Sequence, residues 1–333
     1  MASLQDIADE LDVSVSLVSK VLNARKGTGG ASLATYRAIR AKAAQLGYRK
    51  NISAAALAKG RQGVIGVFIH RKGLPGSAIA EELVEGIADE AGAQGQRLML
   101  QFFETADQFK ALCPSVDRNV LDGLIVGGVT HPELFDELVQ FEQRDVAVVT
   151  VHDLGADPRV INVGMDQVEV SRLATAHLIE RGCRNIAHIA AIDGGTPRFD
   201  GYRKALAEAG IPYKPELVIH VPGYGARRGE EAVAELTSRG LVFDGIVAQS
   251  DHQAIGAMNT LLRAGRRVPQ DVRVIGVDNA PFCELSIVPL SSISQEFRER
   301  GSRAVRLLLE RMNGKAVSSI TISPRLCCRA SSA

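Results

Sequence analysis

The segment DVSVSLVSKVLN, residues 12–23, combines four valines, three serines and one lysine in a pattern that favours an amphipathic helix. Val18, Val21 and Leu22 recur at helical spacing and are expected to face inward. A different set occupies the helix start and the outer face: Val15, Ser16, Ser19 and Lys20. Serine and lysine can bind base edges or phosphates, and valine can contact a thymine methyl group. A solvated surface helix would rarely place a valine in its exposed first turn, so the segment favours a helix that reads DNA over an ordinary amphipathic helix.

The residues around this segment predict a head of three short helices. Ser3 is followed three residues later by an aspartate, a pattern that offers a helix start. Ser14 is placed to cap the second helix, and Ser32 to begin a third that ends at Gly47. Two helices joined by a tight turn, with a third behind them, are typical of a helix-turn-helix domain. We therefore predict a small all-α helix-turn-helix head over residues 1–50.

Charge is distributed unevenly along the chain. The net charge of the 333 residues is +1, but the first 62 hold ten Lys and Arg against four Asp and Glu, a net +6, which leaves −5 for the remainder. No acidic residue occurs between Asp12 and Glu81. A basic head on an acidic body is typical of a phosphate-binding module joined to a soluble partner domain. Double-stranded DNA is therefore the expected partner of the head.

After Val64 the sequence alternates short apolar runs with helical segments. The runs include VIGVFI, RLMLQFF, GLIVGG and VAVVTV in the first half, and NIAHIAA, GIVAQS and VRVIGVD in the second. Buried runs separated by helices predict doubly wound parallel sheets, and two such halves predict a bilobal α/β body. Ligands of open parallel sheets bind at the carboxyl ends of strands. His70 follows the first run, and His152 and Asp153 follow the fourth.

Signatures of catalysis are missing from the sequence. It contains no G-x-x-x-x-G-K-[ST], G-x-G-x-x-G, H-E-x-x-H or G-x-S-x-G motif. The five cysteines are scattered without a C-x-x-C pair, as expected of small buried side chains in a reducing cytosol. No apolar run is long enough to span a membrane, and the acidic N-terminus is unlike a signal peptide. We expect a cytoplasmic protein that is not an enzyme and uses no cofactor or metal.

Two stretches of the head, SLQDIADELDVSVSLVSKVLN and SLATYRAIRAKAAQLGYRKN, resemble the lactose-repressor (LacI) family of bacterial transcription regulators. The body continues the resemblance, nearly to the C-terminus, through HLIERGCRNIAHI, RFDGYRKAL, DHQAIGAMNTLLRAGRRVPQDVRVIGVDN and PLSSISQEF. The resemblance implies that Val15, Ser16 and Lys20 read bases in one half of a pseudo-palindromic operator. It implies phosphate-contacting or capping roles for a further set: Ser3, Ser14, Ser19, Asn23, Ser32 and Thr35.

The resemblance also implies a hinge helix and a homodimer. Asn51 and Leu57 match hinge positions, where paired leucines wedge into the minor groove and kink the DNA. The alanine-rich hinge is too short to be stable alone, so it is expected to fold only when docked. Lys50 stands where proline is common in the family. A passive helical linker with Leu57 packed on the body is the alternative.

The resemblance sets the expected domain boundaries. Residues 51–62 form the hinge helix and linker, and residues 63–333 form a bilobal effector-binding and dimerisation domain that is similar to the periplasmic binding proteins. The first lobe is expected to comprise about residues 63–163 and 296–318. The second is expected to comprise about residues 164–295 and 319–333.

An effector site in the body is implied by four matches to the family. Arg198 matches an effector-gripping arginine, Asp278 an acid that bonds ligand hydroxyls, and Tyr224 an aromatic that stacks on the ligand. Ser250 stands where asparagine or aspartate is usual, which implies a shorter or water-bridged contact. A mutual ion pair of Arg198 and Asp278 is the alternative interpretation. The predicted ligand-binding set is His70, His152, Asp153, Arg198, Tyr224, Ser250 and Asp278.

The sequence therefore predicts a homodimeric, ligand-controlled DNA-binding transcription regulator, a repressor that responds to a sugar or sugar derivative. Carboxylates, an arginine and one aromatic side chain suit a polyhydroxylated ring. A purine is the alternative effector, although it would prefer more aromatic surface than a chain with no tryptophan and 5% aromatic residues offers. A solute-binding protein and a sugar-acting enzyme are the alternatives from other classes. The basic head argues against the first, and ligand turnover would reveal the second.

Overall fold

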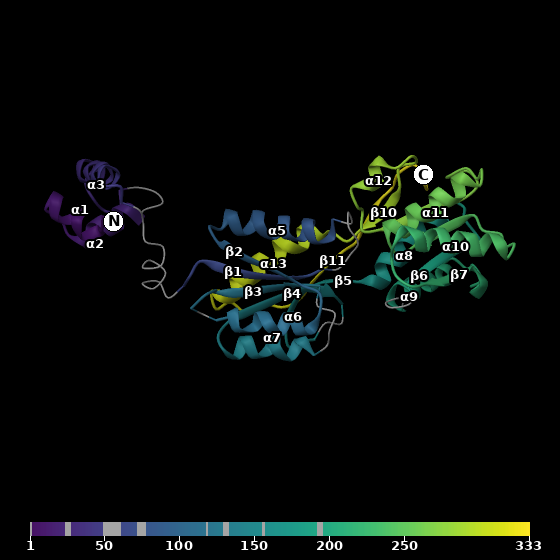
Figure 1. Ribbon diagram of the computed structural model, residues 1–333, viewed down its shortest axis with the longest axis horizontal. Coiled ribbons are helices and arrows are strands. Elements are labelled where there is room, and N and C mark those ends of the chain that lie inside the picture. Colours follow the sequence, from purple (N-terminus) through teal and green to yellow (C-terminus); the bar gives the residue numbers. More distant parts are fainter. Residues whose placement is uncertain are drawn as a thin grey trace. The chain divides into compact units, whose positions relative to one another are not determined.

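The computed structural model describes residues 2–23, 28–48, 61–71, 78–117, 119–128, 133–154, 157–191 and 196–333. The chain divides into two compact units, Met1–Gln62 and Gly63–Ala333, and each is described by itself (Figure 1). Lys50 and the predicted hinge residues Asn51 and Leu57 lie outside the described residues.

The first unit contains a three-helix head. Its helices are α1 (Leu4–Leu11), α2 (Val15–Asn23) and α3 (Leu33–Gln45). Ser3 Oγ accepts the backbone N–H of Asp6 at 3.2 Å, and the Asp6 carboxylate accepts the N–H of Ser3 at 2.8 Å, which confirms the helix start expected at Ser3 and closes a capping box. Asp12 takes the left-handed conformation (φ 50°), which turns the chain sharply into α2. Six buried side chains form the core: Ile7, Ala8, Val18, Val21, Ile39 and Ala43.

The second unit begins with a six-stranded sheet in the order β11-β5-β4-β3-β1-β2, all neighbours parallel. In its register, Ile65 of β1 lies opposite Leu98 of β2 and Gly123 of β3. The strands are β1 (Val64–His70), β2 (Arg97–Phe103), β3 (Gly123–Gly127), β4 (Ala147–Asp153), β5 (Ile161–Met165) and β11 (Ile320–Ile322). The helices of this lobe are α5 (Ile79–Ala93), α6 (Ala106–Leu112), α7 (Leu134–Gln143), α13 (Phe297–Met312) and the 3₁₀ turn η1 (Cys113–Ser115).

A second six-stranded sheet follows, in the order β12-β10-β9-β8-β6-β7. Its strands are β6 (Ile186–Ala191), β7 (Val218–Val221), β8 (Gly245–Ala248), β9 (Arg273–Val277), β10 (Ser291–Ser294) and β12 (Arg325–Cys327). The helices of this lobe are α8 (Gln167–Glu180), α9 (Thr196–Glu208), α10 (Ala226–Ser238), α11 (Asp251–Arg263), α12 (Phe282–Leu285) and the 3₁₀ turn η2 (Pro215–Leu217). Both sheets have the strand order of doubly wound folds, in which ligands bind at the carboxyl ends of strands.

Each sheet buries both faces under helices. In the first sheet, Ile65 and Val67 pack in the cluster with α5 and α13, whereas Phe68 and Leu124 pack in the cluster with α6 and α7. Figure 1 shows α5 and α13 on one face and α6 and α7 on the other. In the second sheet α8 packs beside α9, and α10 beside α11. This double coverage explains why most strands read as continuous apolar runs in the sequence.

The edge strands depart from the predicted pattern. We expected RLMLQFF to be a buried run, but β2 is at the sheet edge and much of it is exposed, including Leu100 and Phe102. We expected only parallel pairing, but β12 pairs antiparallel with β10. β10 ends at the crossing at residues 295–296, whereas β12 begins at the crossing at residues 323–324, so the two strands run in opposite directions. The second sheet is therefore mixed.

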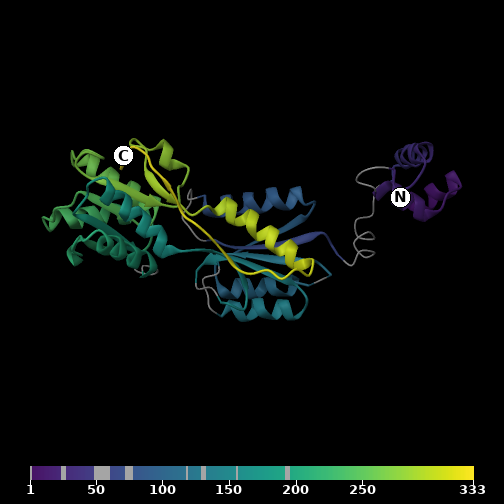
Figure 2. The same ribbon diagram turned by 180° about the vertical axis from the view of Figure 1, so that it is seen from behind.

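The boundary between the lobes also differs from our expectation. Strand β5 extends to Met165, and residues 320–322 pair with β5 in the first sheet, although we expected residues from 319 onward to belong to the second lobe. A three-residue strand shows no periodicity that a sequence pattern could reveal. The chain passes between the sheets at residue 166, at residues 295–296 and at residues 323–324 (Figure 2).

Close backbone packing fixes the helix that follows the second crossing. A Cβ atom on Gly86 of α5 would overlap the carbonyl oxygen of Arg298, and one on Gly301 of α13 would overlap that of Leu83. The two helices therefore approach at their backbones, as only glycine allows. This contact holds the first turns of α13 in place beside the second crossing.

Candidate functional site

Helix α2 presents the side chains that the sequence assigned to DNA. Ser16 and Lys20 are exposed, whereas Val18 and Val21 are fully buried in the head core. Val15 is half-buried and packs partly on that core, so less of it is available than its position in the first turn suggested. Ser19 is half-buried, and the side chain of Asn23 lies outside the described residues. The exposed face of α2 is thus polar and basic, as a helix in the major groove requires.

Three of the predicted phosphate-contacting serines are helix caps. In addition to the Ser3 capping box, Ser14 Oγ accepts the backbone N–H of Leu17 at 3.2 Å. Ser32 Oγ accepts the N–H of Thr35 at 3.1 Å, and the two hydroxyls share a hydrogen bond of 2.8 Å. All three serines are exposed at helix N-termini. Such positions bind phosphate well because free N–H groups and the helix dipole favour an anion there.

In the body, a network of hydrogen bonds joins the predicted ligand-binding residues of the two lobes. Arg198 Nε, in the first turn of α9, donates to Gln167 Oε1 at 2.8 Å. Gln167 Nε2 in turn donates to Asp153 Oδ1, at the end of β4, at 2.7 Å. One glutamine therefore connects an arginine of the second lobe to a carboxylate of the first.

The same glutamine extends the network to Asp278. Gln167 Nε2 also donates to Gln295 Oε1 at 2.7 Å, and Gln295 Nε2 donates to Asp278 Oδ1 at 2.6 Å. Among the described residues no ion pair joins Arg198 to Asp278, so the alternative of a direct pair is not what this structure contains. Arg198 and Asp278 are instead connected through hydrogen bonds of two neutral amides, those of Gln167 and Gln295.

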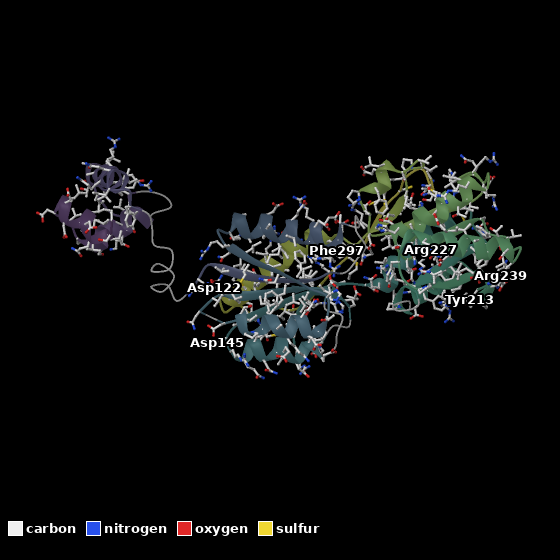
Figure 3. All side chains as sticks on the ribbon, in the orientation of Figure 1. Asp122, Asp145, Tyr213, Arg227, Arg239 and Phe297 are labelled. Carbon is white, nitrogen blue, oxygen red and sulfur yellow. The ribbon has the colours of Figure 1, made fainter. Side chains whose placement is uncertain are left out.

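The carboxyl end of β4 is anchored by buried polar groups. Asn162 Oδ1 accepts the N–H of His152 at 3.0 Å, and Asn162 Nδ2 donates to the carbonyl of Asp153 at 3.1 Å. Arg300 of α13 donates to the His152 carbonyl at 2.7 Å. Its guanidinium lies 5.2 Å from the ring centre of Phe297, which is labelled in Figure 3. These contacts fix the backbone at Asp153, so that its carboxylate lies within hydrogen-bond distance of the Gln167 amide.

Burial shifts the protonation equilibria of these charges. Burial raises the pKa of the Asp278 carboxyl, while Arg198 and the hydrogen bond from Gln295 oppose the increase. Arg300 is 2% exposed, and burial lowers its pKa to about 10, although Asp153 counters part of this effect. A buried arginine bonded mainly to carbonyl groups is costly, which indicates that its anchoring contacts matter to the site.

A further polar group supports Arg198 from within the second sheet. The Arg198 guanidinium donates to the carbonyl of Gln249, the residue after β8. Gln249 Nε2 bonds to His188 Nε2 at 3.2 Å, and the His188 ring stacks on Tyr202 of α9 at 4.8 Å. His188 is fully buried, and burial lowers its pKa to about 3. Its ring is therefore neutral and accepts the amide proton.

The remaining predicted ligand residues have contacts of their own. Ser250 is buried, caps α11 by accepting the N–H of Gln253, and donates to the carbonyl of Tyr224 at 2.7 Å. Tyr224 is 37% exposed. His70 Nε2 bonds to the carbonyl of Glu104 at 3.0 Å, and the His152 ring lies near that of Phe135.

Sequence reasoning missed five residues of the site: Gln167, Gln249, Gln295, Arg300 and His188. The three glutamines stand next to the end of a strand or at a crossing between the sheets, where a polar residue after an apolar run is a usable signal, whereas Arg300 lies within α13. His188 lies inside an apolar run and gave no such signal. Among the described residues no cluster of metal-ligating side chains occurs, and no described helix has the length and apolarity to cross a bilayer.

Comparison with known proteins shows which regulators this chain is similar to. A model of the periplasmic binding protein-like domain matches residues 175–332. The ribose operon repressor of Halalkalibacterium halodurans is 26% identical over 323 residues, which are 96% of this chain and 93% of the relative. The transcriptional regulator CelR of Thermobifida fusca is 27% identical over 326 residues, 96% of this chain and 94% of the relative. Over nearly its whole length the chain is therefore similar to regulators of the LacI family.

Solved structures of LacI-family regulators agree with the architecture. A complex of the regulator CelR with cellobiose matches 99% of this chain and all of that chain, with a TM-score of 0.71 and 26% identity. The Lac repressor dimer bound to operator and an anti-inducer shares the fold, with a TM-score of 0.80, 24% identity and 99% coverage of both chains. The chain thus has the architecture of these regulators, a three-helix head and a body like the periplasmic binding proteins.

Proposed function

We propose that this protein is a transcription regulator of the LacI family. In this proposal it is a homodimeric repressor in the cytoplasm, whose affinity for a pseudo-palindromic operator is controlled by a sugar or sugar derivative. The observation that carries the proposal is the network in which Gln167 and Gln295 tie Arg198 and Asp278 to Asp153. It joins a carboxylate at the end of β4 to a carboxylate after β9 and to a guanidinium in the first turn of α9. A ligand that exchanges bonds with this network changes how the lobes are joined.

The chemistry of these groups suits a polyol. Asp153 and Asp278 accept hydrogen bonds from hydroxyl groups, and Arg198 donates to ring and hydroxyl oxygens in a fixed fork. Relatives are named as a ribose operon repressor and as a regulator complexed with cellobiose, which supports a sugar. The exposed Tyr224 supplies an aromatic face at the end of the segment that Ser250 holds.

The head reads one operator half-site in this proposal. Ser16 and Lys20 reach base edges, Val15 contacts a thymine methyl group, and the caps at Ser3 and Ser32 bind phosphates. Dimerisation brings two such heads onto one operator. Exposed apolar side chains support an interface in each lobe: Leu100 and Phe102 on β2, and Leu285 and Ile287, which are 85% and 87% exposed.

The DNA half of the proposal is tested by selecting operators from random duplexes with the full chain. Lys20→Gln is expected to weaken binding to the selected operator by tenfold or more, in line with about 1–3 kcal/mol for a good base contact. Lys42→Gln is the matched control, because Lys42 carries the same charge on the same head but pairs with Glu10 at 3.0 Å. Equal losses in both variants would show only a general charge effect and refute base reading by α2.

The ligand half is tested by a thermal-shift screen of sugars, sugar acids, sugar phosphates and nucleobases. A ligand at a hundredfold excess over its Kd stabilises the protein by about 2.7 kcal/mol, and we expect the hit to be a sugar. Asp278→Asn is expected to abolish the shift, and the hit is expected to change operator affinity. A nucleobase hit without any sugar hit would overturn the assignment of the effector, and chemical change of the hit on incubation would indicate an enzyme.

A further inference from the structure

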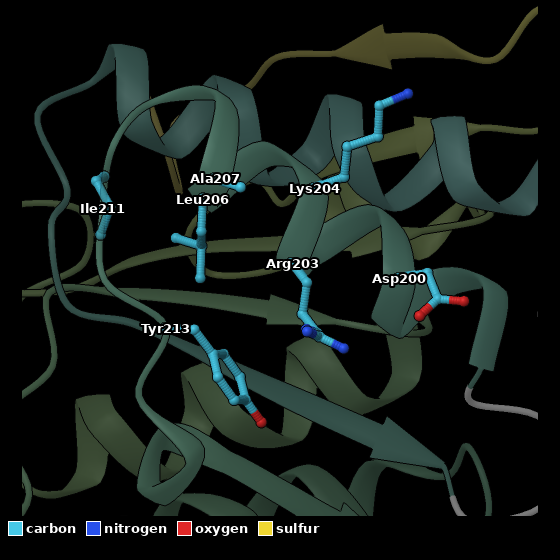
Figure 4. Close-up of a pocket in the computed structure, with 7 residues that line it drawn as sticks. All are labelled: Asp200, Arg203, Lys204, Leu206, Ala207, Ile211 and Tyr213. Carbon is cyan, nitrogen blue, oxygen red and sulfur yellow. The ribbon is translucent and has the colours of Figure 1, made fainter.

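A pocket of about 370 Å³ opens on the second lobe, formed by α9 and the segment that leads to η2 (Figure 4). Its size is at the lower end of the range of small-molecule sites. Arg203 lies five residues after Arg198 on the same helix, which rotates it by about 140° around the helix axis. Arg198 bonds to Gln167 and Gln249, whereas Arg203 lines this pocket. The two arginines therefore serve different sites.

Arg203 is held in position by aromatic rings. Its guanidinium carbon lies 5.8 Å from the ring centre of Phe199 and 5.5 Å from that of Tyr213, which is labelled in Figure 3. Contacts of this kind with ring faces orient the planar group and leave its N–H donors at the edge. Arg203 is exposed, and these contacts offset part of the free-energy cost of ordering its side chain before a ligand binds.

No carboxylate neutralises Arg203 in the described part of the chain. Other arginines of this lobe are paired: Arg172 with Glu169 at 2.6 Å, and Arg239 with Glu235 at 3.1 Å. Asp200 is one turn from Arg203 and lines the same pocket, yet it forms no ion pair with it. An oriented guanidinium without an acceptor is suited to a carboxylate from outside the chain, which it can bind with two parallel hydrogen bonds.

The other walls define the rest of the ligand. Leu206, Ala207, Ile211 and the ring of Tyr213 give an apolar surface beside the cation (Figure 4). Asp200 accepts hydrogen bonds and therefore favours a ligand with a hydroxyl or ammonium group near its acid group. Lys204 adds a second positive charge among the lining residues. A bare inorganic anion would leave the apolar surface uncovered.

We propose that this pocket binds a small organic acid with an apolar side chain and an adjacent hydroxyl or amino group, at a site separate from the Arg198 network. The carboxylate bonds to Arg203, the neighbouring donor bonds to Asp200, and the side chain packs on Ile211 and Tyr213. The site lies on the helix that carries Arg198 in its first turn. The proposal does not depend on which effector the Arg198 network binds.

Calorimetric titration of the full chain with phenyllactate tests the proposal. Arg203→Gln is expected to weaken binding at least tenfold, because a charge-assisted pair of hydrogen bonds is lost. Arg266→Gln is the matched control: Arg266 also lies over a ring, that of Phe243 at 5.7 Å, but does not line this pocket. Arg198→Gln is expected to leave phenyllactate binding unchanged. 3-Phenyl-1,2-propanediol, which lacks the carboxylate, and lactate, which lacks the ring, are each expected to bind more weakly.

A fluorescence measurement locates the bound acid. The chain contains no tryptophan, so Tyr213→Trp keeps a ring beside Arg203 and creates a single emitter in the pocket. Phenyllactate is expected to change this emission, and to lose the effect when Arg203→Gln is added. Absence of heat and of an emission change at millimolar acid would overturn the proposal. So would binding that Arg198→Gln abolishes, or binding with unchanged emission, since the acid would then be elsewhere.

Discussion

The neutral state of His188 predicts a specific dependence of stability on pH. His188 is fully buried on β6, stacks on Tyr202 and accepts a hydrogen bond from Gln249. Burial, with smaller contributions from the charges of His220 and Arg198, lowers its pKa from 6.5 to about 3. The folded protein therefore keeps this ring neutral in a range where the unfolded chain takes up a proton.

The size of the effect follows from linkage. A folded-state pKa below the unfolded value means that the stabilising contribution is complete above pH 6.5 and declines as pH falls toward 3. Each pH unit well below 6.5 costs about 1.4 kcal/mol. Between about pH 7 and about pH 5, this one ring should reduce the free energy of unfolding by about 2 kcal/mol. His188→Phe keeps an aromatic ring on Tyr202 and removes the titrating group.

Urea denaturation followed by circular dichroism at several pH values measures the difference. His188→Phe is expected to lose stability at pH 7, because Gln249 loses its acceptor. The gap between the variant and the wild type is expected to narrow by about 2 kcal/mol on acidification to pH 5. His220→Gln removes an exposed imidazole of the same lobe that makes only a minor contribution to the lowered pKa of His188. It serves as the control, and its profile should stay close to that of the wild type. Parallel profiles for His188→Phe and wild type would refute the reasoning.

Two further variants probe the head and the network. Ser3→Ala removes the acceptor for the Asp6 amide and should destabilise α1 by about 1 kcal/mol. Hydrogen exchange of the backbone amides in α1 should then be roughly fivefold faster than in the wild type. Unchanged exchange would rule out a capping role for Ser3. Gln295→Leu leaves the Asp278 carboxylate and the Gln167 amide without their partner, and should lower the free energy of unfolding by about 2–4 kcal/mol in urea titrations. If the free energy of unfolding of Gln295→Leu equalled that of the wild type, water would have to replace both hydrogen bonds of Gln295 without a loss of stability.

Much of the fold is predictable from the sequence because covered parallel strands must be apolar on both faces. Runs such as VIGVFI and VAVVTV have no other stable arrangement in a chain of this length than the interior of a sheet. The capping box at Ser3 and the inward face of Val18 and Val21 are equally local signals. The direction of an edge strand, in contrast, is not set by a local sequence signal. The antiparallel pairing of β12 depends on where the chain stands after β11, which three-residue strands do not encode.

The site is less predictable than the fold because its parts meet only through the crossings between the sheets. Arg198, Asp153 and Asp278 were identified individually, but nothing in the sequence indicates what joins them. Gln167 is 14 residues from Asp153 and 128 residues from Gln295, yet bonds to both. A glutamine has no characteristic spacing to a partner, unlike a metal-ligating histidine or a phosphate-binding glycine. The role of Gln167 follows only from the structure, in which its amide lies between the Asp153 carboxylate and the Arg198 guanidinium.

The choice of glutamine at both junctions follows from the charges around it. Gln167 donates to the Asp153 carboxylate and accepts from the Arg198 guanidinium, so a single neutral side chain satisfies an anion of one lobe and a cation of the other. A glutamate there would face Asp153 with a like charge, and a lysine would face Arg198 in the same way. Because the amides add no charge, exchanging them for ligand hydroxyls replaces one hydrogen bond to a charged group with another, each worth about 1.5–3 kcal/mol net. Small differences in ligand geometry are then enough to decide whether the lobes stay joined through the protein or through the ligand.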